Sequence, residues 1–99
     1  SELIRLDAST GDFIWASELP GYLDENKNRK KEVVTHHGPI MAGGKLTLAS
    51  SDGKLRQFNP ETGAELRSFV IPNGATTNPI IADGTLYVVS KRGELHAFR

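Results

Sequence analysis

The sequence predicts an all-β fold built from repeated four-stranded antiparallel sheets, and three observations lead to this prediction. The segment His37–Phe58, HGPIMAGGKLTLASSDGKLRQF, aligns without a gap with Thr77–Phe98, TNPIIADGTLYVVSKRGELHAF, at a constant offset of 40 residues. Both copies contain short runs rich in β-branched and aromatic residues, which favour strands. Turns that contain glycine separate these runs at the close spacing typical of hairpins.

The middle part of the chain shows the expected strands most clearly. They are PIMA, KLTLAS, KLRQF and AELRSFVI, and the turn sequences between them are AGGK, SSDGK and NPETG. Because proline cannot donate a hydrogen bond within a sheet, we place Pro39 and Pro79 at the first residue of a strand. In the run Thr85–Ser90, TLYVVS, apolar residues occupy adjacent positions, which predicts a strand covered on both faces.

Four antiparallel strands in each 40-residue unit, covered on both faces, match the blade of a β-propeller. A β-sandwich also has many short strands, but it does not require an ungapped repeat of this length. We therefore predict a fragment of a β-propeller with four-stranded antiparallel blades, of which about two and a quarter are present. Because propellers close with roughly four to eight blades, we expect the chain to be part of a larger protein.

The upstream part of the chain follows the same pattern at a larger offset. Leu3 and Gly11 match Leu55 and Gly63 at an offset of 52 residues, so the first copy carries 12 additional residues. We divide the chain accordingly into the last two strands of a first blade (1–20), an inserted polar loop (21–32), a complete blade (33–74) and the first three strands of a final blade (75–99).

The related sequences LDASTGDFIW and FNPETGAELR each contain a turn between two strands. Asp7 and Asn59 stand where a side-chain oxygen can accept a hydrogen bond from the backbone two residues later. Gly11 and Gly63 can adopt the positive φ that such a turn requires. We interpret both segments as structural turns. Trp15 is expected on the outer strand, packed between blades, with its N–H donating to a backbone acceptor.

The pattern D-x-x-T-G-x-x-x-W, which ends at Trp15 and has Arg67 at the equivalent position of the second copy, resembles the tryptophan-docking repeat of the pyrroloquinoline quinone (PQQ) propeller superfamily. The final stretch TTNPIIADGTLYVVSKRGELHAFR is similar to the C-terminal blades of the BamB family, lipoproteins of the outer-membrane β-barrel assembly machinery. This resemblance implies a non-catalytic protein-interaction scaffold. It also implies a periplasmic location, attached to the outer membrane through an N-terminal lipid anchor that these 99 residues do not contain. The implied partners are the assembly machinery and unfolded β-barrel clients.

The alternative is an enzyme, because quinoprotein dehydrogenases of the same superfamily hold PQQ and calcium in the centre of the ring. Such a site needs hard oxygen ligands and a carboxylate base, for which the candidates are Asp24, Asp52, Asp83 and Glu94. Asp52 and Asp83 precede glycines in hairpin turns, where aspartate is common for local reasons. We therefore expect no catalytic residue, no cofactor and no metal site.

The histidines and the absence of cysteine also argue against a metal site, and the balanced charge argues against a nucleic-acid partner. His36 and His37 are neighbours in an extended segment and should point to opposite sides, so one metal ion cannot easily take both. We interpret these two residues and His96 as structural. The absence of cysteine excludes disulfides and thiolate metal sites. Twelve basic and twelve acidic residues cancel, which argues against a nucleic-acid partner.

The inserted loop is the candidate partner-contact site, because loops on a rigid scaffold often carry recognition. Its apolar anchors would be Tyr22 and Leu23, and its basic cluster would steer an acidic partner. The basic cluster consists of Lys27, Arg29, Lys30 and Lys31. The simpler interpretation is a solvated loop. Open strand edges and uncovered apolar faces further predict that the 99-residue chain self-associates.

Overall fold

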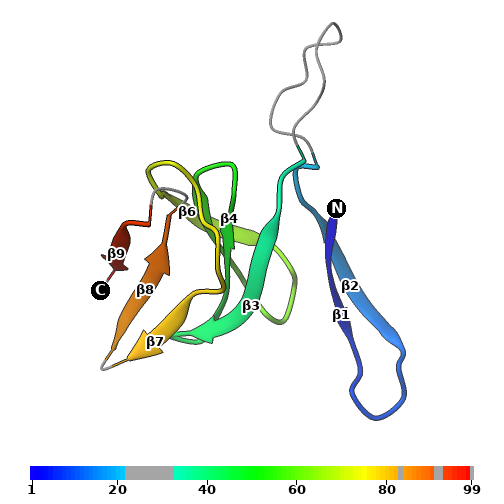
Figure 1. Ribbon diagram of the computed structural model, residues 1–99. Helices are drawn as coiled ribbons and strands as arrows, with labels where there is room; N and C mark the ends of the chain where they lie inside the picture. Colours follow the sequence, from blue (N-terminus) through cyan, green and yellow to red (C-terminus); the bar gives the residue numbers. More distant parts are fainter. Residues whose placement is uncertain (22–32, 83, 91–92, 99) are drawn as a thin grey trace, which may run out of the picture.

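The computed structural model describes residues 1–21, 33–82, 84–90 and 93–98, and within them the chain forms nine strands in three antiparallel sheets (Figure 1). The first sheet pairs β1 (Glu2–Leu6) with β2 (Phe13–Glu18). The middle sheet has the order β3 (His36–Ala42), β4 (Lys45–Ser50), β5 (Lys54–Phe58) and β6 (Glu65–Val70). The last sheet contains β7 (Ile80–Ala82), β8 (Thr85–Val89) and β9 (Leu95–Phe98). Sheets of two, four and three strands are consistent with partial propeller blades, which confirms the predicted fold class.

The two inner strands of the middle sheet, β4 and β5, are largely buried, because their alternating side chains pack against two neighbouring sheets. Leu55 on β5 packs in one apolar cluster with Val88 of the last sheet. Phe58, on the opposite face of the same strand, packs in a second cluster with Trp15 of the first sheet. Four consecutive residues of β5 are buried as a result, since neither face meets solvent.

The two prolines differ from their expected places. Pro39 lies inside β3, which begins earlier, at His36. The ladder of β3 and β4 is irregular between His37 and Ile40, so the proline occupies a bulge where no ladder hydrogen bond is required. Pro79 directly precedes β7, which begins at Ile80. The placement of Pro39 at the first residue of a strand was therefore wrong.

The two repeated turns have the geometry that the sequence predicts. Asp7 Oδ1 accepts a hydrogen bond from the N–H of Ser9 at 2.8 Å. Asn59 Oδ1 accepts one from the second residue after it, also at 2.8 Å. Gly11 and Gly63 have the same positive φ of 78°. The side-chain oxygen thus closes each turn, and glycine provides the left-handed conformation that leads into the next strand.

Trp15, which lies on β2 after the first turn, packs against the middle sheet and joins it to the first sheet. Trp15 is 8% exposed, and its Nε1–H donates to the carbonyl oxygen of Pro60 at 2.9 Å. Arg5 donates to the same oxygen, also at 2.9 Å, and the Ser17 hydroxyl donates to the carbonyl of Gly63. A Cβ atom on Gly63 would lie 2.6 Å from Cδ2 of the indole, so only glycine allows this close approach. The predicted packing of Trp15 between sheets is confirmed.

Gly63→Ala and Gly11→Ala form a matched pair that isolates this docking. Both positions have φ 78°, but nothing lies within 4 Å of a Cβ at Gly11. We expect Gly63→Ala to lower the free energy of unfolding by about 1–3 kcal/mol more than Gly11→Ala, because only the first forces the indole away. Urea unfolding followed by circular dichroism and by the fluorescence of Trp15, the single tryptophan, measures both losses. Equal losses would show that the indole does not depend on Gly63.

Candidate partner-contact site

The predicted partner-contact residues lie outside the described residues, and this holds for all six of them: Tyr22, Leu23, Lys27, Arg29, Lys30 and Lys31. The residues on either side of them are described. They lie where β2 of the first sheet leads towards β3 of the middle sheet (Figure 1). The structure therefore shows how the two ends of the inserted segment are held.

The two ends are hydrogen bonded to each other and to the middle sheet. The N–H of Val34 donates to the carbonyl of Gly21 at 3.0 Å, and Val34 is only 3% exposed. Thr35 donates its N–H to Ser51 Oγ at 2.8 Å and accepts from the N–H of Ser51 at 2.9 Å. The segment between Gly21 and Val34 consequently leaves and returns at one place on the molecule. We call the four residues Gly21, Val34, Thr35 and Ser51 the loop base.

His36 adds a side-chain connection beside the loop base. Its Nε2 lies 2.9 Å from the carbonyl oxygen of Pro20, and its Nδ1 lies 2.7 Å from Ser50 Oγ. A carbonyl oxygen can only accept, so Nε2–H donates to Pro20, while Nδ1 and Ser50 Oγ share the second hydrogen bond. His36 thus ties the end of the first sheet to the middle sheet. Sequence reasoning missed this connection, because Pro20 and Ser50 are far apart in the chain.

Asp52, one of the candidate carboxylates, is paired with Arg56. Two hydrogen bonds join their side chains, at 3.2 Å from Nη1 to Oδ1 and at 2.5 Å from Nη2 to Oδ2. Arg56 is 6% exposed and also lies 3.6 Å from a carboxylate oxygen of Glu65. Burial raises the pKa of Asp52, but the hydrogen bond and positive charge of Arg56 outweigh this effect and hold the pKa below its ordinary value. This pairing gives Asp52 a structural role beyond its place in the hairpin turn.

The other candidate carboxylates and histidines do not meet at one site in the part of the chain that the structure describes. Glu94 accepts a hydrogen bond from Asn73 at 3.3 Å and is exposed to solvent. Nε2 of His96 is buried and has no hydrogen-bond partner among the described residues. Asp24 and Asp83 lie outside these residues. Within the described ranges, no group of three or more histidine, aspartate or glutamate side chains could hold a metal ion.

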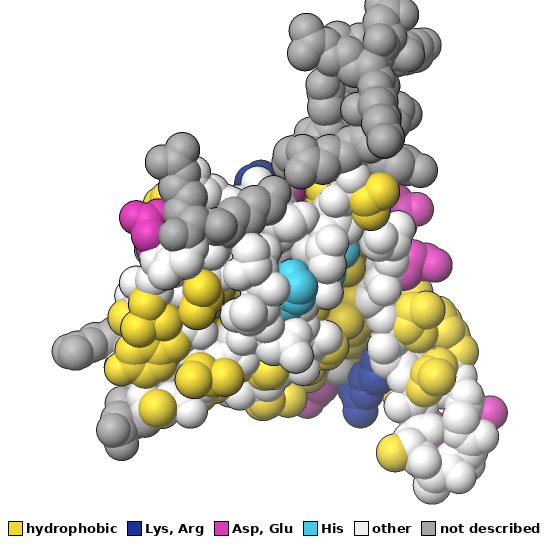
Figure 2. Space-filling view, in the orientation of Figure 1, with side chains coloured by type: hydrophobic (Ala, Val, Ile, Leu, Met, Phe, Trp, Pro, Cys, Tyr) yellow, Lys and Arg dark blue, Asp and Glu magenta, His cyan; other side chains and the backbone are white. Residues whose placement is uncertain are grey.

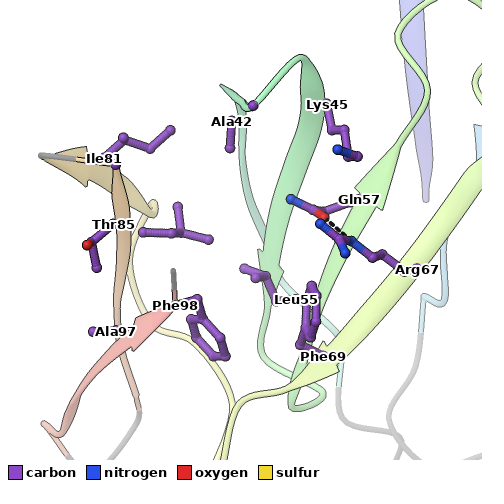
Figure 3. A pocket seen from close by; sticks show the side chains of 13 residues that line it. Ala42, Lys45, Leu55, Gln57, Arg67, Phe69, Ile81, Thr85, Ala97 and Phe98 are labelled. Carbon is purple, nitrogen blue, oxygen red and sulfur yellow. Dashed lines mark hydrogen bonds between the residues drawn. The ribbon is translucent and has the colours of Figure 1, made fainter.

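A cavity of about 500 Å³ lies between the middle and last sheets, and sequence reasoning did not predict it (Figure 3). Leu55, Phe69 and Phe98 supply apolar walls, and Arg67 and Lys45 reach it from the middle sheet. Arg67 stands at the position that Trp15 occupies one repeat earlier. The exchange of tryptophan for arginine is the sequence feature from which the cavity could have been predicted, because a guanidinium group cannot fill the volume of an indole.

Hydrophobic side chains are exposed on the two outer sheets, as Figure 2 shows over the first hairpin and over the last sheet. On the first sheet Phe13 is 66% exposed, and on the last sheet Leu95 is 66% exposed. Further exposed apolar residues on these sheets are Ile4, Leu6, Ile14, Ile80 and Ile81. Among the described residues, no helix is long and apolar enough to span a membrane.

Comparison with known proteins gives one family. The family model described as "Outer membrane protein assembly factor BamB" matches residues 1–99. The outer membrane protein assembly factor BamB of Salmonella typhimurium LT2 is 25% identical to the chain over 123 aligned positions. This alignment covers 96% of the chain and 31% of the Salmonella protein, so the chain spans less than a third of that relative's length.

Asp52→Asn should weaken the folded state in a pH-dependent manner. Because the folded-state pKa of Asp52 lies below the ordinary value of 3.8, the stabilisation by Arg56 is fully present above that value. It is lost as the pH falls through the lower, folded-state pKa. We expect the variant to lose about 1–3 kcal/mol near neutral pH, because the buried Arg56 guanidinium loses its charged partner.

Urea unfolding at pH 7, 4 and 3 measures this effect, and the variant should depend less on pH below 4 than the unchanged chain. Glu61→Gln, which alters an exposed carboxylate in a turn, is the control and should leave the stability at pH 7 nearly unchanged. An Asp52→Asn variant with the stability and pH dependence of the unchanged chain would contradict the assigned pairing.

Proposed function

The chain belongs to the BamB-like family of PQQ-repeat proteins, and we propose from this that it is a non-catalytic scaffold that assists the assembly of β-barrel proteins at the outer membrane. The observation that carries the proposal is the match of the family model over the whole chain. The name of the Salmonella relative assigns assembly of outer membrane proteins to that protein. A fold of stacked antiparallel sheets supports the transfer, because such sheets present rims and strand edges to other proteins.

The same family relationship supports a location and a set of partners. We place the protein in the periplasm, attached to the outer membrane through an N-terminal lipid anchor. Its partners are the proteins of the outer-membrane assembly machinery, together with unfolded β-barrel clients. An extended client segment can add to an exposed sheet edge through main-chain hydrogen bonds, which suits a client that has not yet formed its own sheet.

The inserted loop is the part of the chain that we propose contacts the assembly machinery. The loop base supports this role, because the bonded ends at Gly21 and Val34 hold the loop beside the junction of two sheets. Tyr22 and Leu23 are proposed as apolar anchors. The basic residues Lys27, Arg29, Lys30 and Lys31 are proposed to steer an acidic surface of the partner.

Reversing the charge of the basic cluster should slow binding to this partner. The variant carries Lys27→Glu, Arg29→Glu, Lys30→Glu and Lys31→Glu, and we expect its association rate to fall about tenfold at low salt, because steering depends on long-range charge. The measurement is stopped-flow binding to the purified barrel component of the assembly machinery at two ionic strengths.

Lys54→Glu, an exposed charge reversal at the start of β5, is the control for this experiment. It should change the rate by less than twofold. Rates that remain equal in the unchanged chain and the loop variant would remove the loop from the proposed contact.

We also propose that the isolated 99-residue chain self-associates through its exposed apolar sheets. Phe13→Lys together with Leu95→Lys should reduce the average mass at micromolar concentration, because each substitution places a charge on a surface that association would bury. Light scattering measures the mass, and Asn78→Lys, at an exposed polar position, is the control. A monomeric unchanged chain under these conditions would contradict the proposal.

A further inference from the structure

Asn73 is the single asparagine of the chain that precedes a glycine. The side-chain amide of an asparagine can be attacked by the backbone nitrogen of the next residue, and glycine hinders this attack least because it has no side chain. Asn59 and Asn78 each precede a proline, which has no backbone N–H to react in this way. Asn73 is also exposed to the water that completes the reaction.

The structure places this asparagine in a tight turn between the middle and last sheets. Its central residues are Pro72 and Asn73. The N–H of Gly74 closes the turn by donating to the carbonyl oxygen of Ile71 at 3.0 Å. A proline followed by a residue with positive φ is typical of a type II turn, and Asn73 has φ 69°. Asparagine tolerates this left-handed conformation better than most residues, which explains its presence here.

The backbone of this turn is anchored on both sides. Ile71 and Ala75 are buried, and each donates its N–H to a backbone carbonyl at the end of β4 or in the turn that follows β4. Between them, a Cβ atom on Gly74 would overlap with the backbone carbonyl of Ser51. The nitrogen of Gly74 therefore cannot approach the Asn73 side chain unless the turn opens.

The side chain of Asn73 is held as well, by a residue of the last sheet. Its Nδ2–H donates to Oε1 of Glu94 at 3.3 Å, and Glu94 directly precedes β9. An attack by Gly74 must break both the hydrogen bond that closes the turn and this contact. The folded state thus protects Asn73, and the reaction proceeds from states in which the junction of the two sheets has opened locally.

We propose that Asn73 is a site of spontaneous deamidation, that its rate follows the opening of this junction, and that its product weakens the junction. The backbone nitrogen of Gly74 bonds to Cγ of Asn73, the bond from Cγ to Nδ2 breaks, and ammonia leaves with the former amide proton. Water then opens the succinimide ring by adding a hydroxyl to one carbonyl carbon and a proton to the nitrogen. The result is aspartate or isoaspartate. This inference does not require the assembly role.

Both products disturb the contact with Glu94. Aspartate replaces the amide donor by a carboxylate, so that two negative charges face each other where a hydrogen bond now joins the side chains. Isoaspartate adds one carbon atom to the main chain of a turn that is anchored on both sides. Neither product fits the present turn, and the link between the middle and last sheets is weakened.

Peptide mapping by mass spectrometry measures the conversion of Asn73 in the full 99-residue chain at mildly alkaline pH. The reference is the free peptide VIPNGATT, in which no fold holds the turn. We expect the chain to convert about tenfold more slowly than the peptide, because its turn must first open. Glu94→Ala should speed the conversion in the chain about threefold by removing the acceptor. Glu61→Ala, at another exposed glutamate, is the control and should not change it.

Asn73→Asp measures what the product does to the junction. Urea unfolding at pH 7 should show the equilibrium constant for folding reduced about fivefold, because the new carboxylate repels Glu94 and the hydrogen bond is lost. In a Glu94→Gln background the same substitution should cost much less, since glutamine carries no charge and can donate to the aspartate. Asn73→Gly keeps the left-handed conformation and should show no conversion at this position.

Three results would overturn the proposal. The first is conversion of Asn73 in the folded chain as fast as in the free peptide, or conversion in neither. The second is a Glu94→Ala chain that converts at the unchanged rate. The third is an Asn73→Asp variant as stable as the unchanged chain. The comparison of chain and peptide uses no variant, so it tests the protection even where a substitution prevents folding.

Discussion

The described structure depends on the docking of one indole ring against one glycine. Trp15 brings its ring to Gly63 so closely that a single additional carbon atom would overlap with it. The hydrogen bond to Pro60 fixes the ring in its plane, and Arg5 and Ser17 add donors to the same turn. The turn between β5 and β6 therefore has two roles. It connects two strands of the middle sheet, and it is the surface on which Trp15 of the first sheet packs. The first and middle sheets are thereby positioned relative to each other.

The middle sheet shows why such contacts are required. Its inner strands, β4 and β5, direct alternate side chains to opposite faces, and both faces are largely buried. A sheet of this kind is stable only when it is packed on both sides. Arg56 is buried on one of these faces and is tolerated there because Asp52 neutralises it. The outer sheets carry exposed apolar residues, among them Phe13 and Leu95.

Much of the fold could be predicted from the sequence because the repeat makes the chain its own comparison. The spacing of Gly11 and Gly63 identified the turns, and the exchange of Trp15 for Arg67 separated packing from backbone requirements. The bulge at Pro39 could not be predicted in this way, because a pattern of residue types does not reveal a shift in strand register. The contact of His36 with Pro20 and the cavity beside Arg67 depend on how distant segments meet, which periodicity does not determine.

The loop residues proposed as the partner site illustrate the same limit. Their place in an insertion and their side-chain types alone indicated them, whereas the loop base emerged from contacts between distant residues. The spacing of contacts along the chain has a further consequence, for the order of folding. The β4–β5 ladder joins residues close in sequence, such as Ala49 and Leu55, whereas the bond from Trp15 to Pro60 spans 45 residues. Closing short loops costs less entropy, so we expect the hairpin contacts to form before the contact between Trp15 and Pro60. Docking of the indole is then expected as a late step, and it stabilises the two sheets that it joins.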